Sequence, residues 1–388
     1  MKRSSKKTPP RRTLLRKLLK WAAWCFFLIL LSAGGLVLYA FREIGDSPTP
    51  EREQAFNRLH NYKAGAFLYP ESPDYYRPAK NYGTPKEHKN LFLRLLVGPE
   101  NKPPHPLPVK KLDSDSFSQV PAALEVCWLG HSSMILDLDG KRLMIDPVLG
   151  NAAPLPGLAR RFQPSPIEKS DLPKVDAVVI SHNHYDHLER STILAMVDKT
   201  EMFLVPLGLG STLEGWGCPK EKIVELNWGD RFRFENGLTI TAVPTRHYSA
   251  RSWKDRKKTL WSGYAFVGPR HKVFYSGDGS YDHRFKLFGK LFGPFDLTII
   301  ESGAYNARWP DSHMFPDETV QAHLDLKGKV LMPVHWGVFD LAMHPWDESI
   351  RSILKEASKK KIQVATPVQG ERFVPGKSTF PKWWEKVQ

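Results

Sequence analysis

The sequence contains little cysteine and, over its first 42 positions, no acidic residue. Three cysteines occur in 388 residues, Cys25, Cys127 and Cys218. Cys25 lies in a long apolar run and Cys127 in a strand-like run, so at most one disulfide can form outside the apolar run. This excludes the disulfide framework of a small secreted domain, and cysteine usage indicates no particular compartment.

Acidic residues are absent before Glu43, whereas ten of the 56 basic residues lie in the same stretch. Removing these ten leaves 46 basic against 41 acidic residues, a net of about +5 out of the formal +15. Most of the positive charge therefore belongs to an N-terminal tail. The sequence also has no RNA- or DNA-binding motif, so we expect no nucleic-acid partner.

Charged residues are also absent from Trp21 to Phe41, which reads WAAWCFFLILLSAGGLVLYAF. About 20 apolar residues span a bilayer as a helix, and aromatic residues such as Trp21, Trp24 and Tyr39 suit its interfaces. The alternative is a cleaved signal peptide, whose apolar region covers roughly 7–15 residues. This run is longer and no clear cleavage site follows it, which favours an uncleaved anchor.

Four regions follow from this composition. We expect a basic cytoplasmic tail at 1–20, a transmembrane anchor at 21–41, a proline-rich linker or arm at 42–118 and the main domain at 119–388. The cationic N-terminus predicts that the main domain lies on the far, periplasmic or extracytoplasmic side of the membrane. Within the arm, residues 91–98 (LFLRLLVG) form a candidate short amphipathic helix, more typical of core packing than of membrane contact.

Strand and helix patterns alternate from about Ala122 onward. A hairpin is expected over 133–147, around the turn signal Asp139-Gly140. Helices are expected over 190–199 and 316–326, the second with the acidic first turn that follows Pro316. Further strands are expected over 124–130, 176–181, 202–206, 238–244, 271–277, 295–302 and 329–337. Many strands with interspersed helices predict a layered α/β domain.

Titratable residues cluster directly after the apolar run Ala177–Ile180. The pattern His182-x-His184-x-Asp186-His187 supplies imidazole and carboxylate groups, which are ligands for zinc and similar metals. Residues two apart can point the same way in a strand-to-loop turn, so one metal can be shared by His182 and His184, with a second metal further round the loop. The alternative is that these are solvated loop histidines. That explanation suits a single histidine better than this cluster.

Three more candidate ligands follow apolar strands elsewhere in the chain. His247 ends LTITAVPTRH, Asp278 follows HKVFYSG and His335 ends KVLMPVH. Ligand sites in layered α/β folds gather at the carboxyl ends of strands. Each residue alone has an ordinary explanation as a surface, turn or packed side chain. Four loops together predict a site for two metals.

The order HxHxDH, His, Asp, His resembles the metallo-β-lactamase superfamily, whose fold is an αββα sandwich. The segments WLGHSSMILDLDGKRLMIDPVL, NHYDH, GPFDLTIIESGAYNARW, SHMFPDE and HWGVF resemble, more narrowly, the N-acylphosphatidylethanolamine-hydrolysing phospholipase D family. The likeness runs from about residue 122 to 370. It implies that 119–388 is a metallo-β-lactamase-fold hydrolase domain preceded by the transmembrane helix.

The resemblance also implies roles for individual residues. The first zinc would be held by His182, His184 and His247, and the second by Asp186, His187 and His335, with Asp278 bridging them. His313, in SHMFPDE, matches the family's substrate-side histidine, and Asp186 and His313 are the expected catalytic residues. His131, in LGHSS, is expected to pack and hydrogen-bond beneath the site. Gly279 departs from the family pattern, in which a threonine follows the bridging aspartate.

The function expected from this resemblance is a membrane-anchored phosphodiesterase of phospholipase D type, with two zinc ions per chain and a metal-bridging hydroxide as nucleophile. Its substrate would be N-acylphosphatidylethanolamine or a related phospholipid, with a homodimer left open. One alternative is a zinc hydrolase of another ester, lactone, lactam or non-lipid phosphodiester, because a fold does not fix a substrate. A second is an anchored binding protein without activity, which the complete ligand set disfavours.

Overall fold

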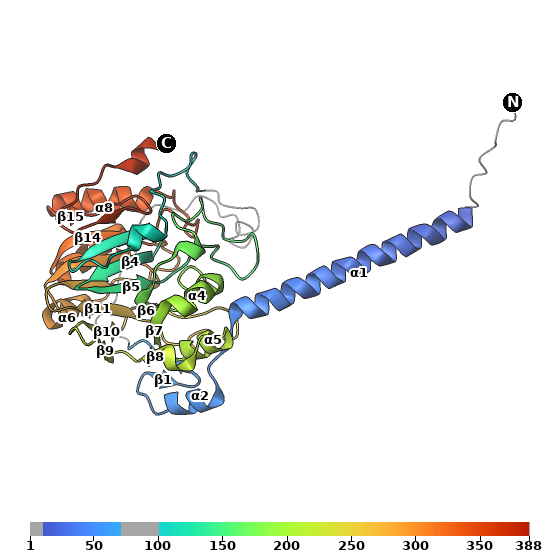
Figure 1. Cartoon of the computed structure of the whole chain (residues 1–388), viewed down its shortest axis with the longest axis horizontal. Coiled ribbons are helices and arrows are strands. Elements are labelled where there is room, and N and C mark those ends of the chain that lie inside the picture. The colour runs from blue at the N-terminus through green and yellow to red at the C-terminus, as the bar shows by residue number, and fades with distance from the viewer. Residues whose placement is uncertain (1–10, 71–100, 388) are drawn as a thin grey trace. The chain divides into compact units, whose positions relative to one another are not determined.

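The computed structural model describes residues 11–70 and 101–387 and divides the chain into two units, Met1–Glu43 and Ile44–Gln388 (Figure 1). The first ten residues of the basic tail lie outside the described residues. The helix predicted over residues 91–98 lies outside them as well.

A single long helix, α1 (Arg11–Ile44), accounts for the described part of the first unit. Its segment Leu15–Ile44 is long and apolar enough to cross a membrane by length and composition. Its large apolar side chains, Trp24 and Leu30 among them, are exposed, which separates it from the buried core helix of a soluble protein. A signal sequence passes the same test of length and composition, so α1 is a candidate membrane span.

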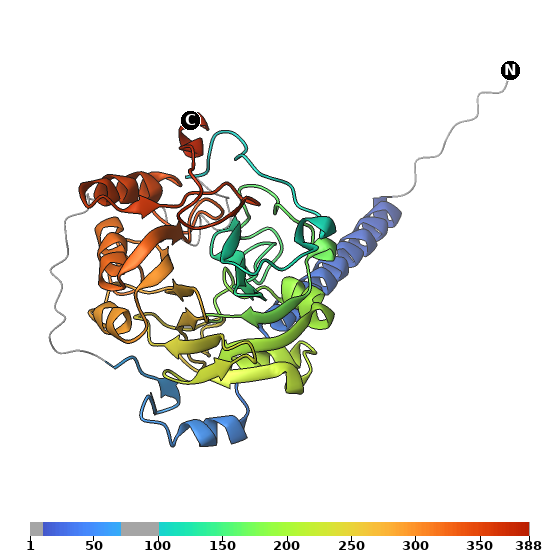
Figure 2. The same cartoon turned by 60° about the vertical axis from the view of Figure 1, so that its left-hand side comes forward.

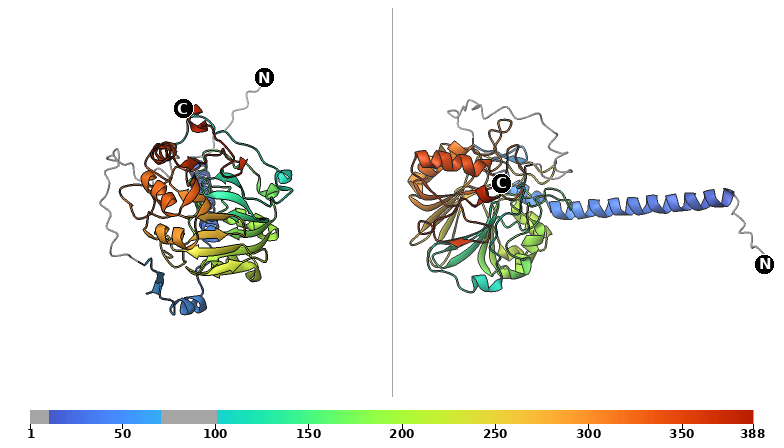
Figure 3. Two further views of the ribbon diagram at one scale, coloured as in Figure 1. Left: turned by 90° about the vertical axis from the view of Figure 1, so that its left-hand side faces the viewer. Right: turned by 90° about the horizontal axis from the view of Figure 1, so that it is seen from above.

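The second unit contains two seven-stranded mixed sheets that face one another (Figures 2 and 3). In spatial order the first sheet consists of β16 (Arg372–Phe373), β3 (Glu125–Gly130), β4 (Ser133–Leu138), β5 (Lys141–Ile145), β6 (Val175–Val179), β7 (Thr200–Pro206) and β8 (Ile223–Leu226). The second consists of β15 (Gln363–Val364), β14 (Gly328–Val334), β13 (Phe295–Glu301), β12 (Lys272–Tyr275), β11 (Gly263–Val267), β10 (Thr239–Val243) and β9 (Arg231–Arg233).

Apolar side chains on the inner faces of both sheets form the main core, with Trp128 and Leu136 from one sheet and Tyr264 and Leu297 from the other. The outer faces are covered by helices: α4 (Arg190–Met196) and α5 (Leu209–Gly215) on the first sheet, and α6 (Arg284–Leu291), α7 (Pro316–Asp325) and α8 (Glu348–Lys359) on the second. Short 3₁₀ helices η1 to η5 cover Ser114–Phe117, Lys169–Asp171, Val197–Lys199, Lys220–Lys222 and Trp383–Lys386. The order helix, sheet, sheet, helix is the αββα sandwich that the sequence predicted, so the fold prediction is confirmed.

The hairpin β4–β5 forms where the sequence predicts it. Leu138 pairs with Lys141 across the two-residue turn, and both turn residues, Asp139 (φ 51°) and Gly140 (φ 87°), have positive φ. Positive φ at both central positions is the geometry of the hairpin turns that Asp-Gly favours. The turn fixes the register and therefore the end of β5, which leads into the site described below.

Residues 44–70, from the first part of the expected arm, are part of the second unit. They form α2 (Pro50–Phe56) and a small hairpin of β1 (Tyr62–Lys63) and β2 (Ala66–Phe67). The rings of Phe56, Tyr62 and Phe67 are buried in a cluster with Leu260 and Trp261. Arg52 of α2 also forms ion pairs with Glu214 of α5 and Glu225 of β8. Aromatic burial and these partly buried ion pairs hold the segment in place.

Candidate metal centre

Strand directions bring the expected ligands to one edge of the sandwich. In the first sheet β3 and β5 are both antiparallel to β4, and β5 is parallel to β6. In the second sheet β10 and β12 are both antiparallel to β11, and β12, β13 and β14 are parallel. The carboxyl ends of β3, β5 and β6 therefore lie at one edge of the first sheet, and those of β10, β12, β13 and β14 lie at one edge of the second. The candidate ligands lie in the loops that follow β6, β10, β12 and β14.

Three histidine rings converge from two loops at this edge. The His182 Nε2 atom lies 2.8 Å from His184 Nδ1, which lies 3.2 Å from His247 Nε2. Two ligand atoms bound tetrahedrally at zinc distances lie roughly 3.3 Å apart. The three nitrogens are thus spaced as ligands of a single ion are.

A second group adjoins the first. The Asp186 Oδ2 atom lies 3.6 Å from His187 Nε2 and 3.2 Å from His335 Nε2. Asp278 lies between the two groups: its Oδ2 atom is 3.1 Å from His187 Nε2 and 3.0 Å from His335 Nε2. The same oxygen is 3.8 Å from the Nε2 atom of His182 and also of His247. One carboxylate oxygen therefore faces both groups.

Several buried polar atoms in this cluster have no hydrogen-bond partner. They include Asp278 Oδ1 and also His187 Nε2 and His335 Nε2, whose close approach to Asp278 Oδ2 does not have the geometry of a hydrogen bond. A buried polar atom without a partner is costly, and one explanation for such atoms in a folded protein is an ion. The donor set, five imidazoles and two carboxylates, is what divalent transition metals bind. The residues present therefore fit two metal ions.

Burial keeps three of the rings neutral. It lowers the pKa of His184 to about 4 and holds the pKa values of His182 and His247 well below the usual range, where the neighbouring imidazoles lower them further. A neutral imidazole presents a lone pair, which a protonated ring cannot do. These three side chains are therefore in the protonation state that ligation requires.

The rings nearest the two carboxylates show the opposite shift. Burial lowers the pKa of His335, but the Asp278 and Asp186 carboxylates outweigh it and raise the pKa to about 10. The same carboxylates raise the pKa of His187 well above its usual range against the effect of burial. The Asp186 and Asp278 carboxylates thus stabilise positive charge between them, and a bound divalent cation would be stabilised in the same way.

Asp146, which sequence reasoning missed, holds the His187 ring from behind. Its Oδ2 atom lies 2.7 Å from His187 Nδ1, and it also accepts hydrogen bonds from the Ser181 hydroxyl and from Tyr275. A carboxylate on the far nitrogen of a ligating histidine fixes the tautomer and orients the ring. In the sequence, an aspartate before Pro147 at the end of a strand is also typical of a turn, so its position alone carried no signal.

His131 lies at the same edge, as expected, and hydrogen-bonds there. Its Nε2 atom is 3.0 Å from Asp186 Oδ2, while burial and the nearby His335 lower its pKa to about 3. Its carbonyl accepts the backbone N–H of His335 at 3.1 Å. A neutral His131 therefore donates to Asp186 and fixes the loop that carries His335.

His313 lies beside both groups, half-buried, with its ring centroid 5.3 Å from that of His247 and 5.0 Å from that of His335. Its Nδ1 atom lies 3.3 Å from the Oε2 atom of the fully buried Glu301. Glu301, which sequence reasoning also missed, accepts the Met314 N–H on its other oxygen at 2.6 Å. This arrangement orients the His313 ring and leaves its Nε2 atom on the side away from Glu301.

Three of the nine non-glycine residues with positive φ in the described part of the chain lie at the site. His131 (φ 54°), Asp146 (φ 40°) and His335 (φ 70°) have left-handed backbone conformations. Residues other than glycine adopt this region rarely, and it persists only where the surrounding structure enforces it. Three strained positions next to one another indicate that the geometry of this edge is held for a function.

Gly279, the departure from the family pattern, is explained by its neighbour Thr245. A Cβ at residue 279 would lie 2.1 Å from the Thr245 hydroxyl oxygen, far inside contact distance. That hydroxyl donates a 2.7 Å hydrogen bond to the Asp278 carbonyl. Thr245 therefore occupies the space that a larger residue 279 would need, and it steadies the Asp278 loop.

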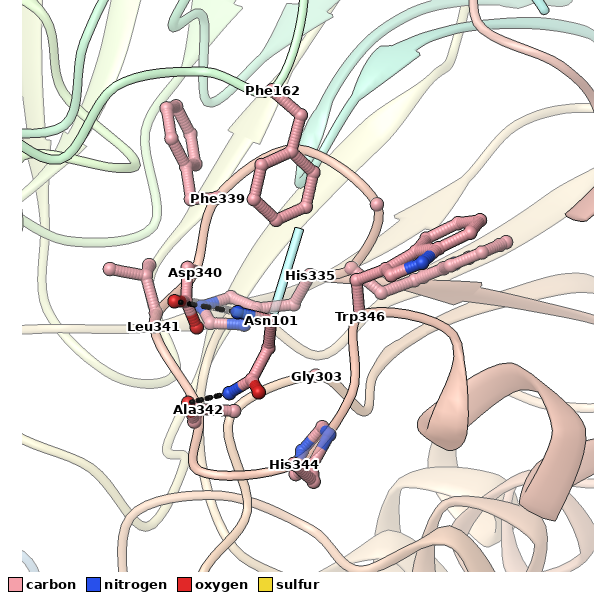
Figure 4. A pocket seen from close by; sticks show the side chains of 12 residues that line it. Asn101, Phe162, Gly303, His335, Phe339, Asp340, Leu341, Ala342, His344 and Trp346 are labelled. Atoms are coloured by element: carbon pink, nitrogen blue, oxygen red, sulfur yellow. Dashed lines mark hydrogen bonds between the residues drawn. The ribbon is translucent and has the colours of Figure 1, made fainter. Parts of the chain in front are cut away.

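A pocket opens beside His335 (Figure 4). Its lining combines aromatic side chains, among them Phe162, Phe339 and Trp346, with the polar side chains of Asp340 and His344. Asn101 closes one side, where its side-chain amide donates to the Ala342 carbonyl. The arrangement places both aromatic and polar side chains next to the cluster of histidines and carboxylates.

The sequence matches a family model described as a beta-lactamase superfamily domain over residues 141–336. It is also 40% identical to an uncharacterized protein of Mycobacterium tuberculosis, over 84% of this chain and 87% of that protein. N-acyl-phosphatidylethanolamine-hydrolyzing phospholipase D 1 of Caenorhabditis elegans is 35% identical, over 64% of this chain and 74% of the relative.

Among solved structures, the chain is similar to Igni18, a metallo hydrolase of Ignicoccus hospitalis, with a TM-score of 0.51 and 20% identity. The match covers 64% of this chain and 97% of that structure. At this level of identity the likeness concerns the fold alone. It agrees with the two facing sheets and their outer helices.

Proposed function

The chain belongs to the metallo-β-lactamase superfamily and is a metal-binding hydrolase of it, and from this premise we propose that it is a binuclear zinc phosphodiesterase of phospholipase D type. The observation that carries the proposal is the position of Asp278, whose Oδ2 atom lies within 3.8 Å of a ring nitrogen in both histidine groups. A carboxylate in that position suits two ions that share one ligand.

In this proposal, His182, His184 and His247 would hold the first metal and Asp186, His187 and His335 the second, and Asp278 would serve both. The nitrogen-rich donor set suits zinc better than magnesium or calcium, which prefer oxygen ligands. When bound, two such ions supply Lewis acidity and lower the pKa of water to near neutrality.

The protein's own side chains supply the remaining chemistry. Hydrolysis of a phosphodiester adds a water oxygen to phosphorus and breaks the bond to the leaving alcohol, which must gain a proton. In its imidazolium form His313 donates Nδ1–H to Glu301 and carries a second N–H on Nε2, on the other side of the ring. We assign it the hydrogen bond to the substrate phosphate or the proton for the leaving group. The Asp186 carboxylate accepts a hydrogen bond from His131. We assign Asp186 two roles, as a metal ligand and as a catalytic residue.

We propose N-acylphosphatidylethanolamine or a related phospholipid as the substrate. The pocket beside His335 carries aromatic side chains, Phe162 and Phe339 among them, which offer apolar contacts to a lipid next to the reacting phosphate. The relative from Caenorhabditis elegans, by its name, hydrolyses N-acyl-phosphatidylethanolamine. A pocket of this kind also admits other lipid esters, so the bond that is cut has to be measured.

Product identification tests the proposed function. Purified full-length protein with N-acylphosphatidylethanolamine is expected to release phosphatidic acid and N-acylethanolamine, and a chelator is expected to abolish the release. Mass spectrometry of both products reads the outcome. Release of a free fatty acid instead would make the protein a carboxylic ester or amide hydrolase. Absence of any lipid hydrolysis by metal-loaded protein would contradict the substrate.

Asp146→Asn is expected to weaken metal binding by about 10–100-fold, as loss of the carboxylate behind a ligating histidine does. The amide keeps the shape but not the charge that holds the His187 Nδ1–H. Competition with a chelator measures the affinity. The matched control is Asp176→Asn in β6, a partly buried carboxylate that binds Lys141 and the Arg142 N–H away from the site. Equal affinities in both variants would contradict the role of Asp146.

We also propose that α1 anchors the protein in a membrane, with the N-terminus in the cytoplasm and the catalytic domain on the far side. The support is the one-sided basic tail, because positive residues are retained in the cytoplasm. A periplasmic reporter fused after residue 45 or at the C-terminus is expected to be active, and a cytoplasmic reporter inactive. The reverse pattern would place the catalytic domain in the cytoplasm.

A further inference from the structure

A basic loop with an exposed tryptophan lies between β10 and β11, at residues 248–258. Trp253 is 87% exposed, the largest exposed fraction among the large apolar side chains of the described residues. The exposed side chains beside it are Lys254, whose Nζ atom lies 4.6 Å from the Trp253 ring centroid, and Arg256. Tryptophan is highly buried on average, so an almost fully exposed ring between cationic side chains is an unusual feature of this surface.

The loop is positive on its outer side. It contains Lys254, Arg256, Lys257 and Lys258 and one acidic residue, Asp255. The Asp255 carboxylate is buried and accepts hydrogen bonds from the backbone N–H groups of Arg251 and Ser252. Beyond the loop, Glu53 lies 3.6 Å from the Lys258 ammonium group. The cations nearest Trp253 therefore face solvent without a carboxylate from their own loop.

Arg251 fixes the base of this loop to two other parts of the unit. Its Nη1 atom donates to the carbonyls of Asn183 and Leu188, at the two ends of the loop that carries His184, Asp186 and His187. Its Nε atom donates at 3.1 Å to the carbonyl of Ile44. Ile44 is the last residue of α1 and lies three positions after Phe41, the end of the uncharged run.

Chain length then limits how far this loop can be from a bilayer. Three residues span at most about 11 Å. If α1 crosses the membrane, Ile44 lies at its surface, and the Arg251 contact holds the base of the loop there as well. Interfaces of bilayers are enriched in tryptophan, and anionic headgroups attract lysine and arginine.

We propose that residues 248–258 form a docking loop for an anionic lipid surface, in which Trp253 enters the interface and Lys254 and Arg256 contact the headgroups. The inference rests on the proposed membrane anchoring and deepens it. Because His247 immediately precedes the loop, docking brings the metal site to the lipid surface. A phospholipid then reaches the site without crossing water.

A fluorescent label at residue 253 tests the docking without any turnover. The full-length chain with Cys25→Ser retains only the buried Cys127 and Cys218, so an added exposed cysteine takes the label. Trp253→Cys carries an environment-sensitive dye, and the protein is reconstituted into phosphatidylcholine vesicles with or without phosphatidylglycerol. The matched control is Leu291→Cys in α6, a residue that is 61% exposed beside Lys290 on the outer face of the second sheet.

The dye at residue 253 is expected to shift to the blue and to be quenched at least about twofold by brominated lipid, more strongly in the anionic vesicles, whereas the dye at residue 291 is expected to change little. Adding Lys254→Glu is expected to reduce the quenching in anionic vesicles. Equal behaviour at both positions, or quenching at residue 291 alone, would overturn the proposal. A protein that docks but hydrolyses no phospholipid would contradict the proposed function and leave the docking intact.

Discussion

Replacing Asp278 with alanine is expected to lower the hydrolysis rate by roughly three orders of magnitude or more, beyond the 10–100-fold effect of losing an outer partner of a metal ligand. Its Oδ2 atom faces the ring nitrogens of His187 and His335 at 3.1 and 3.0 Å and those of His182 and His247 at 3.8 Å. Removing it takes a ligand from both proposed metals at once. It also leaves a cavity among four buried imidazoles.

Metal content and rate measured on the same sample separate the possible causes. Elemental analysis of the unaltered protein is expected to give about two metal ions per chain, mostly zinc, and fewer in Asp278→Ala. Asp311→Ala is the matched control. The Asp311 side chain is 69% exposed, and its loss removes a carboxylate near His313 in the sequence. A fully active protein without metal would reject the binuclear mechanism. A normal rate in Asp278→Ala would reject the shared ligand.

The seven proposed ligands could be located from the sequence because each one directly follows or lies near the end of an apolar strand. The parallel and alternating strands then bring His182, His247, Asp278 and His335 to one edge, as the strand pattern predicted. Their roles as ligands remain a proposal. The alternation around Asp139-Gly140 likewise predicted the β4–β5 hairpin, because Asp-Gly has a specific turn geometry.

Residues that act through a neighbour gave no such signal. Asp146 and Glu301 end their strands as single carboxylates, and their importance appears only once the fold places them against His187 and His313. Contacts between distant segments were hidden for the same reason: Phe67 packs against Trp261 across nearly 200 residues. Strand β11 (Gly263–Val267) was missed because it follows the basic loop and lacks a polar alternation, being buried at four of its five positions.

His313→Ala is expected to slow hydrolysis by about 10²–10³-fold, by analogy with loss of one donor from an oxyanion hole. The reason is its place beside the ligands His247 and His335 with Nε2 turned away from Glu301. Metal content is expected to stay near that of the unaltered protein, because the seven proposed ligands remain. The matched control is His283→Ala, which removes a histidine that is 53% exposed at the start of α6.

The same variant distinguishes three roles for His313. A lower rate with unchanged metal makes it a group that acts on the substrate, and Glu301→Gln should then reproduce part of the loss by releasing the orientation of its ring. A lower rate with lost metal would make it an eighth ligand, an outcome the geometry allows because one atom each of Asp278, Glu301, His313 and His335 lie within 4.8 Å of one another. A rate equal to that of the unaltered protein would show that His313 has no catalytic role and is only part of the segment before α7. Its ring, directed at the metal site by a fully buried carboxylate, favours the first role.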